Sequence, residues 1–260
     1  MKQLHMIRLR VDPLSVMDID DTKKLYRNVS DDEMYAMDWG YLLHVYLKEL
    51  FGNAAPKVFS ADTNKIHDGI PVLGYTSADA KVLKKDSGEF ANPRIWASVD
   101  WKSFASKPIP DTFRQGQRMH FSLRTAPVIR QHRKVAEDGS VIDERVEIDP
   151  FLREVSRADP NTRLDRFSIY RQWFLEKMKR DQGVKILDVA VTEFQLRKFV
   201  RRTGAKMVKD RITKYPVRPS VTFKGSLEIA DLERFYQLLE CGVGRHKTFG
   251  FGMMLLQRPR

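Results

Sequence analysis

Two closely spaced glycine pairs enclose a run of bases near the end of the chain. The pairs are Gly242 with Gly244 and Gly250 with Gly252, and the bases between them are Arg245, His246 and Lys247. Glycine lets backbone approach a ligand closely and cations attract phosphate, so the stretch suits a phosphate chain. It is not a dinucleotide-binding fingerprint, because Lys247 stands where the third glycine should be. A tight turn before a last strand is the alternative interpretation.

Tyr41 and His44 are the second set of residues that could do chemistry. Apolar residues recur at spacings of three and four from Asp38 to about Leu50, which predicts a helix with Asp38 as its N-cap. At about 100° per residue, Tyr41, His44 and Lys48 fall opposite the apolar stripe. Histidine titrates near neutral pH. His44 is therefore either an ordinary surface residue or a displayed functional group.

The composition is that of a globular protein. Hydrophobic residues make up 42% and aromatic residues 10% of the 260 residues, enough for one large domain or two small ones. A single cysteine, Cys241, excludes an internal disulfide framework and a cysteine-rich metal site. No apolar run is long enough to span a bilayer, and the first residues lack a signal-peptide pattern. We expect a cytoplasmic protein with no membrane partner, no bound metal and no cofactor.

All of the excess positive charge lies in the C-terminal half. Residues 1–111 carry 15 Lys and Arg against 16 Asp and Glu, a balance of −1, whereas residues 112–260 carry 31 against 18, a balance of +13. A surplus in one half is typical of a polyanion-binding surface. Nucleic acid is favoured over membrane because no basic amphipathic helix with an aromatic face stands out. A merely solvated basic surface is the alternative.

The first 111 residues predict the order β-α-β-β-α-β. Strands are expected at His5–Val11, Lys57–Ala61, Ile70–Thr76 and Ile95–Trp101, and helices at Asp38–Leu50 and Asp79–Lys85. The acidic stretch Asp18–Asp38 is expected to be a short helix or a loop insertion. This order is the ferredoxin-like pattern that RNA-recognition modules also use. Pro108–Asp111 is the expected linker.

Residues 112–260 predict the same order with a larger helical insertion. Strands are expected at Gln117–Leu123, Val184–Phe199, Lys214–Leu227 and Phe249–Leu256, and helices at Asn161–Arg180 and Ile229–Glu240. Asp138-Gly139 predicts a hairpin turn between the first of these strands and the first helix. The expected fold class is α+β, with two tandem ferredoxin-like domains at 1–111 and 112–260 and antiparallel sheets.

Basic residues concentrate around two predicted hairpins of the second half. The segment from Phe194 to Lys224 holds ten Lys and Arg and one acid, Asp210, around an expected tip at Thr203-Gly204. Bases that flank a β-ribbon tip can enter a groove or straddle phosphates, whereas the alternative is a solvated loop. The predicted RNA-binding set is Arg124, Arg130, Arg133, Lys134, Arg197, Arg201, Arg202, Lys206, Gly242, Gly244, Arg245, Lys247, Gly250 and Gly252.

Three stretches carry a resemblance to a known family. They are Tyr41-Leu42-Leu43-His44 with Leu50-Phe51 following, the strand Met119–Pro127 that contains Leu-Arg-x-x-Pro, and the segment from Val221 through Gly252 with its glycine-rich loop. Together they resemble the CRISPR repeat-processing endoribonucleases of the type I-E system, called CasE, within the repeat-associated RNA-binding superfamily. The resemblance spans nearly the whole chain.

This resemblance implies an activity and its partners. The activity is metal-independent cleavage of CRISPR precursor RNA at the 3′ base of each repeat hairpin, which leaves a 2′,3′-cyclic phosphate. The implied partners are the repeat hairpin RNA and the other subunits of a surveillance complex. The implied catalytic residues are His44 and Tyr41, because RNA supplies its own 2′-hydroxyl nucleophile and needs only proton transfer, alignment and cations. Which of the two acts as base stays open.

Two rival functions use the same residues differently. A non-cleaving RNA-binding subunit of the same superfamily has no reason to display Tyr41 and His44 on the polar face of a helix. A generic RNA-recognition protein is disfavoured, because no predicted strand carries a Lys/Arg-Gly-Phe-Gly-Phe motif. The similar letters Phe249-Gly250-Phe251-Gly252 lie in the terminal loop and strand instead.

Overall fold

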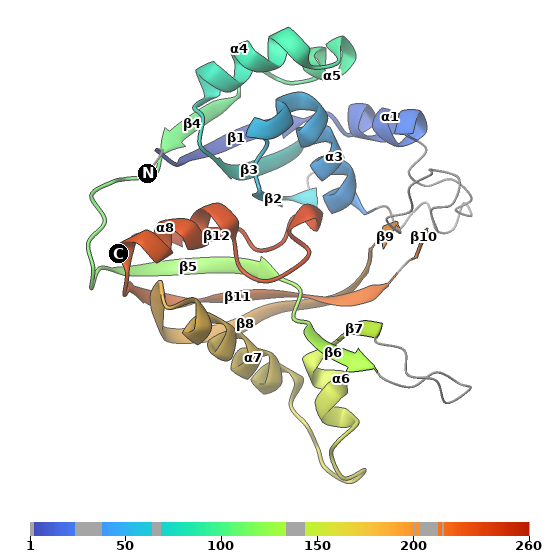
Figure 1. Ribbon diagram of the computed structural model, residues 1–260, viewed down its shortest axis with the longest axis vertical. Coiled ribbons are helices and arrows are strands. Elements are labelled where there is room, and N and C mark those ends of the chain that lie inside the picture. Colours follow the sequence, from blue (N-terminus) through green and yellow to red (C-terminus); the bar gives the residue numbers. More distant parts are fainter. Residues whose placement is uncertain are drawn as a thin grey trace.

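The computed structural model describes residues 3–23, 38–63, 69–133, 144–199, 201–202, 213–214 and 216–259. These residues form two four-stranded antiparallel sheets, one from each half of the chain (Figure 1). The sheets and the helices beside them make up a mixed α and β fold.

The first sheet has the strand order β2-β3-β1-β4. Its strands are β1 (His5–Val11), β2 (Val58–Ala61), β3 (Ile70–Thr76) and β4 (Ala105–Pro108). The helices beside it are α1 (Pro13–Lys23), α3 (Trp39–Phe51), α4 (Ala80–Phe90) and α5 (Pro93–Ala97), with a 3₁₀ turn η1 (Gly52–Ala54). Alternate residues Ile7, Leu9 and Val11 of β1 are buried against the apolar stripe of α3, as the sequence pattern predicts.

The second sheet has the strand order β12-β5-β11-β8. Its strands are β5 (Arg118–Thr125), β8 (Val184–Lys198), β11 (Val217–Ile229) and β12 (Met254–Gln257). The helices are α6 (Pro150–Val155), α7 (Arg166–Asp181) and α8 (Leu232–Cys241), with a 3₁₀ turn η4 (Lys247–Phe249). Two short ribbons pair β6 (Ile129–Arg133) with β7 (Glu144–Ile148) and β9 (Arg201–Arg202) with β10 (Thr213–Lys214).

Both sheets share one topology. In each, the first strand in chain order lies between the fourth and the third, and the second strand lies at the edge beyond the third. The ferredoxin-like prediction is therefore confirmed for both halves of the chain. The division into domains at Asp111 stays a prediction, because the two sheets share buried contacts.

The predicted fourth strand at Ile95–Trp101 is wrong. Asn92 accepts a hydrogen bond from the Arg94 backbone N–H and Pro93 occupies the first helical turn, so this segment begins the short helix α5. Strand β4 forms instead at Ala105–Pro108 and pairs with β1, which places Pro108 in the sheet rather than in a linker.

Several element bounds also differ from the expected ones. Helix α4 continues to Phe90, and α7 begins at Arg166, because Asp165 caps it by accepting hydrogen bonds from the N–H groups of Phe167 and Ser168. The final strand starts at Met254, since η4 and two glycines with positive φ occupy the preceding residues. The expected turns at Asp138-Gly139 and Thr203-Gly204 lie outside the described residues.

A buried interface joins the two halves of the chain. Val58 and Tyr75 of the first sheet belong to the core of the second, and the Tyr75 hydroxyl donates a hydrogen bond of 2.7 Å to the Met254 carbonyl. Val58 also lies against Gly242, where the glycine-rich loop leaves α8. Strands β2 and β3 therefore help to hold that loop beside the first half, and Figure 1 shows it next to α3.

Candidate active site and RNA-binding surface

Helix α3 carries Tyr41 and His44. Asp38 caps it as predicted, because its carboxylate accepts a hydrogen bond of 3.2 Å from the Tyr41 backbone N–H. The apolar stripe that includes Leu43 and Leu47 is buried in the first core. This packing fixes the rotation of the helix, and so fixes which way Tyr41 and His44 point.

The glycine-rich loop, Gly242–Gly252, is closed at its neck by backbone hydrogen bonds. Val243 N donates to the Gly252 carbonyl at 2.9 Å, and Gly252 N donates to the Arg124 carbonyl at 2.8 Å. Gly242 has φ +69°, and a Cβ there would lie 2.4 Å from Val58 and 2.7 Å from the Gly252 oxygen. Only glycine satisfies both demands, so the glycine serves packing within the protein itself.

The loop packs directly against α3. An added Cβ at Gly40 would lie 2.2 Å from the Phe249 carbonyl oxygen, and the rings of Tyr41 and Phe249 stack with centroids 5.7 Å apart. Gly40 and His44 are four residues apart and so share one face of the helix. The structure thus brings the two sets of chemically suggestive residues together. It also corrects the expected position of Tyr41, whose ring is half-buried against the loop rather than displayed on a polar face.

His44 is half-buried. Burial lowers its pKa below the ordinary value of 6.5, and the charge of Lys48, one turn further along, lowers it further. The direction of this shift means that the imidazole is neutral at pH 7 in the RNA-free protein. A neutral imidazole has a ring nitrogen that can accept a proton.

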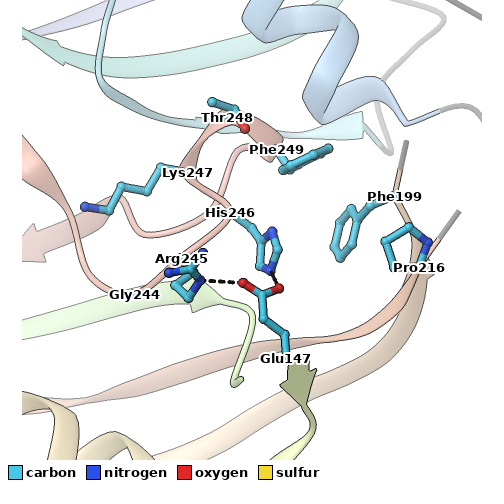
Figure 2. A pocket seen from close by; sticks show the side chains of 9 residues that line it. All are labelled: Glu147, Phe199, Pro216, Gly244, Arg245, His246, Lys247, Thr248 and Phe249. Atoms are coloured by element: carbon cyan, nitrogen blue, oxygen red, sulfur yellow. Dashed lines mark hydrogen bonds and ion pairs between the residues drawn. The ribbon is translucent and has the colours of Figure 1, made fainter. Parts of the chain in front are cut away.

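Glu147 on β7 lies beneath the loop and contacts two of its bases (Figure 2). Its carboxylate is 2.6 Å from Arg245 Nε and 2.9 Å from His246 Nε2. The contact with His246, together with the charge of Arg245, lowers the Glu147 pKa to about 2. These residues, with Phe199, Pro216 and Phe249, line a cavity of about 390 Å³. The sequence analysis missed Glu147. The one signal that could have found it is a negatively charged residue in a predicted hairpin that is otherwise rich in basic residues.

Lys247 is oriented differently from Arg245 and His246. Figure 2 shows its side chain extending away from Glu147. Burial lowers its pKa, and the charged groups that act on it include Lys177 and Asp181 at the end of α7. Of the three basic residues in the loop, only Arg245 and His246 contact the Glu147 carboxylate.

A second cavity, of about 420 Å³, shares Phe199 and Phe249 with the first. It is lined by Trp39 of α3 and by Leu196, Arg197 and Lys198 of β8. Nearby, Arg124 donates a hydrogen bond of 3.2 Å to the Gly250 carbonyl and lies over the Phe251 ring. Burial, followed by the charge of Arg197, lowers the Arg124 pKa to about 10, so it stays cationic at neutral pH.

Four of the other predicted RNA-binding residues lie on the two ribbons. Arg130 is exposed on β6 and faces Glu147 in the ladder. Arg133, Arg201 and Arg202 lie on β6 and β9, and their side chains are not described. Lys134 and Lys206 lie outside the described residues. The structure therefore brings Arg197 and Arg245 to cavities that Phe249 lines and Arg124 to Gly250, whereas the role of the ribbon tips stays a prediction.

The chain matches the family of CRISPR-associated proteins over residues 4–258. It belongs to this family. No curated protein matches the sequence. Within the described residues, no helix is long and apolar enough to cross a membrane, and no three His, Cys, Asp or Glu side chains form a group that could hold a metal ion.

Solved structures of CRISPR-associated proteins share the fold of this chain. The CRISPR endoribonuclease Cse3 bound to a 19-nucleotide RNA is 20% identical, with a TM-score of 0.55 over 99% of this chain and 100% of that one. Cas6e from Escherichia coli K-12 is 17% identical, with a TM-score of 0.57 over 98% and 100%. A chain of a CRISPR RNA-guided surveillance complex is 15% identical, with a TM-score of 0.54 over 98% and 100%.

The contact between Gly40 and Phe249 predicts the sign of a stability change. Gly40→Ala should lower the free energy of unfolding by about 1–3 kcal/mol in urea denaturation, because the new methyl group meets backbone that cannot rotate away. Gly88→Ala in α4 is the matched control, since its Cβ would lie an ordinary 3.5 Å from Trp96. The control should gain up to about 1 kcal/mol from helix propensity. A Gly40→Ala protein as stable as wild type would contradict the tight docking of the loop on α3.

Proposed function

We propose that this CRISPR-associated protein is a metal-independent endoribonuclease that cleaves CRISPR precursor RNA at the 3′ base of the repeat hairpin. It retains the mature crRNA as a subunit of a surveillance complex and works in the cytoplasm, where the transcript is made. The observation that carries the proposal is the docking of the Tyr41 and His44 helix on a glycine-rich loop with basic side chains. The fold shared with Cse3 and Cas6e supports it.

The reaction needs two proton transfers. The 2′-oxygen next to the scissile phosphate attacks phosphorus and gives up its proton, the bond from phosphorus to the 5′-oxygen breaks, and that oxygen is protonated. The products are a 2′,3′-cyclic phosphate and a free 5′-hydroxyl. Because His44 has a lowered pKa and is neutral at pH 7, we assign it the role of base. Tyr41, whose ring is held by Phe249, aligns the phosphate or protonates the leaving oxygen.

The cations hold the RNA and offset charge in the transition state. Arg124 stays charged although it is partly buried, and Arg197 lies beside the cavity that Trp39 of α3 lines. Cations in a partly desolvated site interact with phosphate more strongly than cations in water. Most Lys and Arg residues lie in the second half of the chain, so RNA binding and proton transfer are assigned to different parts of the molecule.

Replacing His44 tests the catalytic assignment. His44→Ala should slow single-turnover cleavage of a repeat hairpin by about 10²- to 10⁴-fold, the usual contribution of general acid–base catalysis. RNA affinity should stay near wild type. His120→Ala, a change of an exposed histidine on β5, is the matched control and should cleave normally.

The substrate and the products test the rest of the reaction. EDTA should leave the wild-type rate unchanged, and a 2′-deoxy nucleotide at the cleavage site should block it. Cleavage by His44→Ala at the wild-type rate would move the chemistry to another group, such as His246 or His132. Tight binding by wild type without cleavage would favour the alternative function, a non-cleaving RNA-binding subunit.

The lowered pKa of His44 sets the expected pH dependence. If neutral His44 is the base, kcat/KM should rise with pH through a value below 6.5 and then stay level. Lys48→Met should move this rise to higher pH, because removing the lysine charge lets the pKa return toward its ordinary value. If His44 acts as the acid instead, kcat/KM will fall with rising pH over the same range. Cleavage rates measured from pH 4.5 to 8.5 distinguish the two.

Salt dependence tests the binding surface. If about six phosphates are neutralised, the logarithm of the RNA association constant should fall with the logarithm of the salt concentration at a slope of roughly −4 to −5. Arg197→Ala and Arg130→Ala should each weaken binding and reduce the slope by about 1. The matched control is Arg118→Ala, which removes an exposed arginine paired with Glu228 at the far end of β5. Slopes equal to wild type in both test variants would mean that β6 and β8 do not contact phosphate.

A further inference from the structure

Glu147 is negatively charged, although the proposed function calls for positively charged side chains at this surface. It lies opposite Arg130 in the β6–β7 ribbon, and its side chain is 6% exposed. Besides Arg245 and His246, it has Arg218 as a neighbour, with Nε 3.8 Å away. A carboxylate beside an RNA-binding loop repels phosphate and neutralises cations that would otherwise attract it. Its contribution must therefore differ from direct attraction of RNA.

The contacts of Glu147 act on a strained point in the loop. His246 has φ +59°, a left-handed conformation that residues with a Cβ adopt rarely. Glu147 contacts the His246 ring at one edge, and Phe199 stacks on its face with centroids 5.7 Å apart and planes 10° from parallel. Arg245, the preceding residue, is tied to the other oxygen of the same carboxylate. These contacts hold the backbone at the entrance to η4.

The strained residue connects directly to the catalytic helix. Phe249 N donates a hydrogen bond of 2.9 Å to the His246 carbonyl, which closes the 3₁₀ turn η4. At the end of that turn, the carbonyl of Phe249 packs against Gly40 and its ring stacks on Tyr41. A shift at His246 would therefore pass through one short turn to the first turn of α3.

We propose that Glu147 is a positioning residue, which clamps Arg245 and His246 so that Phe249 holds Tyr41 and the helix that carries His44 in the geometry for cleavage. The inference rests on the proposed endoribonuclease function. It also gives the β6–β7 ribbon a second role. If this ribbon contacts RNA through Arg130, the bound RNA would stabilise the contacts of Glu147 with Arg245 and His246.

Kinetics separate this role from RNA binding. Glu147→Ala should lower the single-turnover rate at saturating hairpin RNA by about 10- to 100-fold, since small misplacements of reacting groups have effects of this size. RNA affinity should change less than threefold, because a lost negative charge offsets a looser loop. Glu147→Gln keeps an acceptor for Arg245 and should recover part of the rate. Glu228→Ala, which also removes a carboxylate paired with an arginine, is the matched control and should behave as wild type.

A double-mutant cycle tests the path. Phe249→Leu removes the ring that stacks on Tyr41 while keeping an apolar side chain. If Glu147 acts through Phe249, the loss of rate in Glu147→Ala/Phe249→Leu should be clearly smaller than the product of the two single losses. Losses that simply multiply would overturn the proposed path.

Hydrogen–deuterium exchange of the RNA-free protein gives a readout that does not depend on cleavage. Glu147→Ala should speed exchange of the amides in Arg245–Phe249 and in the first turn of α3, whereas Glu228→Ala should not. If Glu147→Ala fails to fold, Glu147→Gln takes its place and should show the same pattern more weakly. Wild-type exchange, or equal losses of rate and affinity, would overturn the positioning role. An inactive wild type would refute the proposed function, and exchange would then decide the role of Glu147.

Discussion

The packing of the Phe249 carbonyl against Gly40 sets the distance between the two halves of the site. Any larger residue at position 40 would push the loop away, because the Cβ would meet backbone rather than a flexible side chain. The loop cannot yield easily either, since its neck is hydrogen-bonded to β5 and its first glycine is fitted against β2. The loop is thus held by both sheets, and α3 is held by the loop and by its own core.

This constraint explains why two ferredoxin-like units form one site. Each sheet alone buries its apolar face under its own helices, as the separate cores around α3 and α7 show. What the second unit adds to the first is a loop that covers the start of α3, and what the first adds to the second is β2 and Tyr75 in its core. In the proposed function, proton transfer and RNA binding therefore meet at a contact that neither unit could provide by itself.

The sequence predicted the elements whose signals are local. The N-cap Asp38, the alternation in β1 and β5 and the end of α8 at Gly242 depend on neighbours in the chain, and they appear where expected. The strand prediction after Asn92 is wrong because the apolar and aromatic residues of this segment suit a strand, whereas the Asn92-Pro93 cap starts a helix. The sequence predicts an exposed Tyr41, because no local signal indicates that a loop about two hundred residues later in the chain packs on it. The sequence also does not link Glu147 to Arg245 and His246, because these residues are about a hundred positions apart and meet only in the fold.

The charge distribution gives the site two opposing influences on its histidine. In the RNA-free protein, burial and the charge of Lys48 favour neutral His44. A bound phosphate backbone would bring negative charge near the imidazole and favour its protonated form. Arg124 and Arg197 of the second half would counter that effect, because the proposed function places them beside phosphate near α3. In the proposed function, cations on the opposite unit would therefore do more than hold RNA, because by offsetting the phosphate charge they would favour a neutral His44 that can accept a proton.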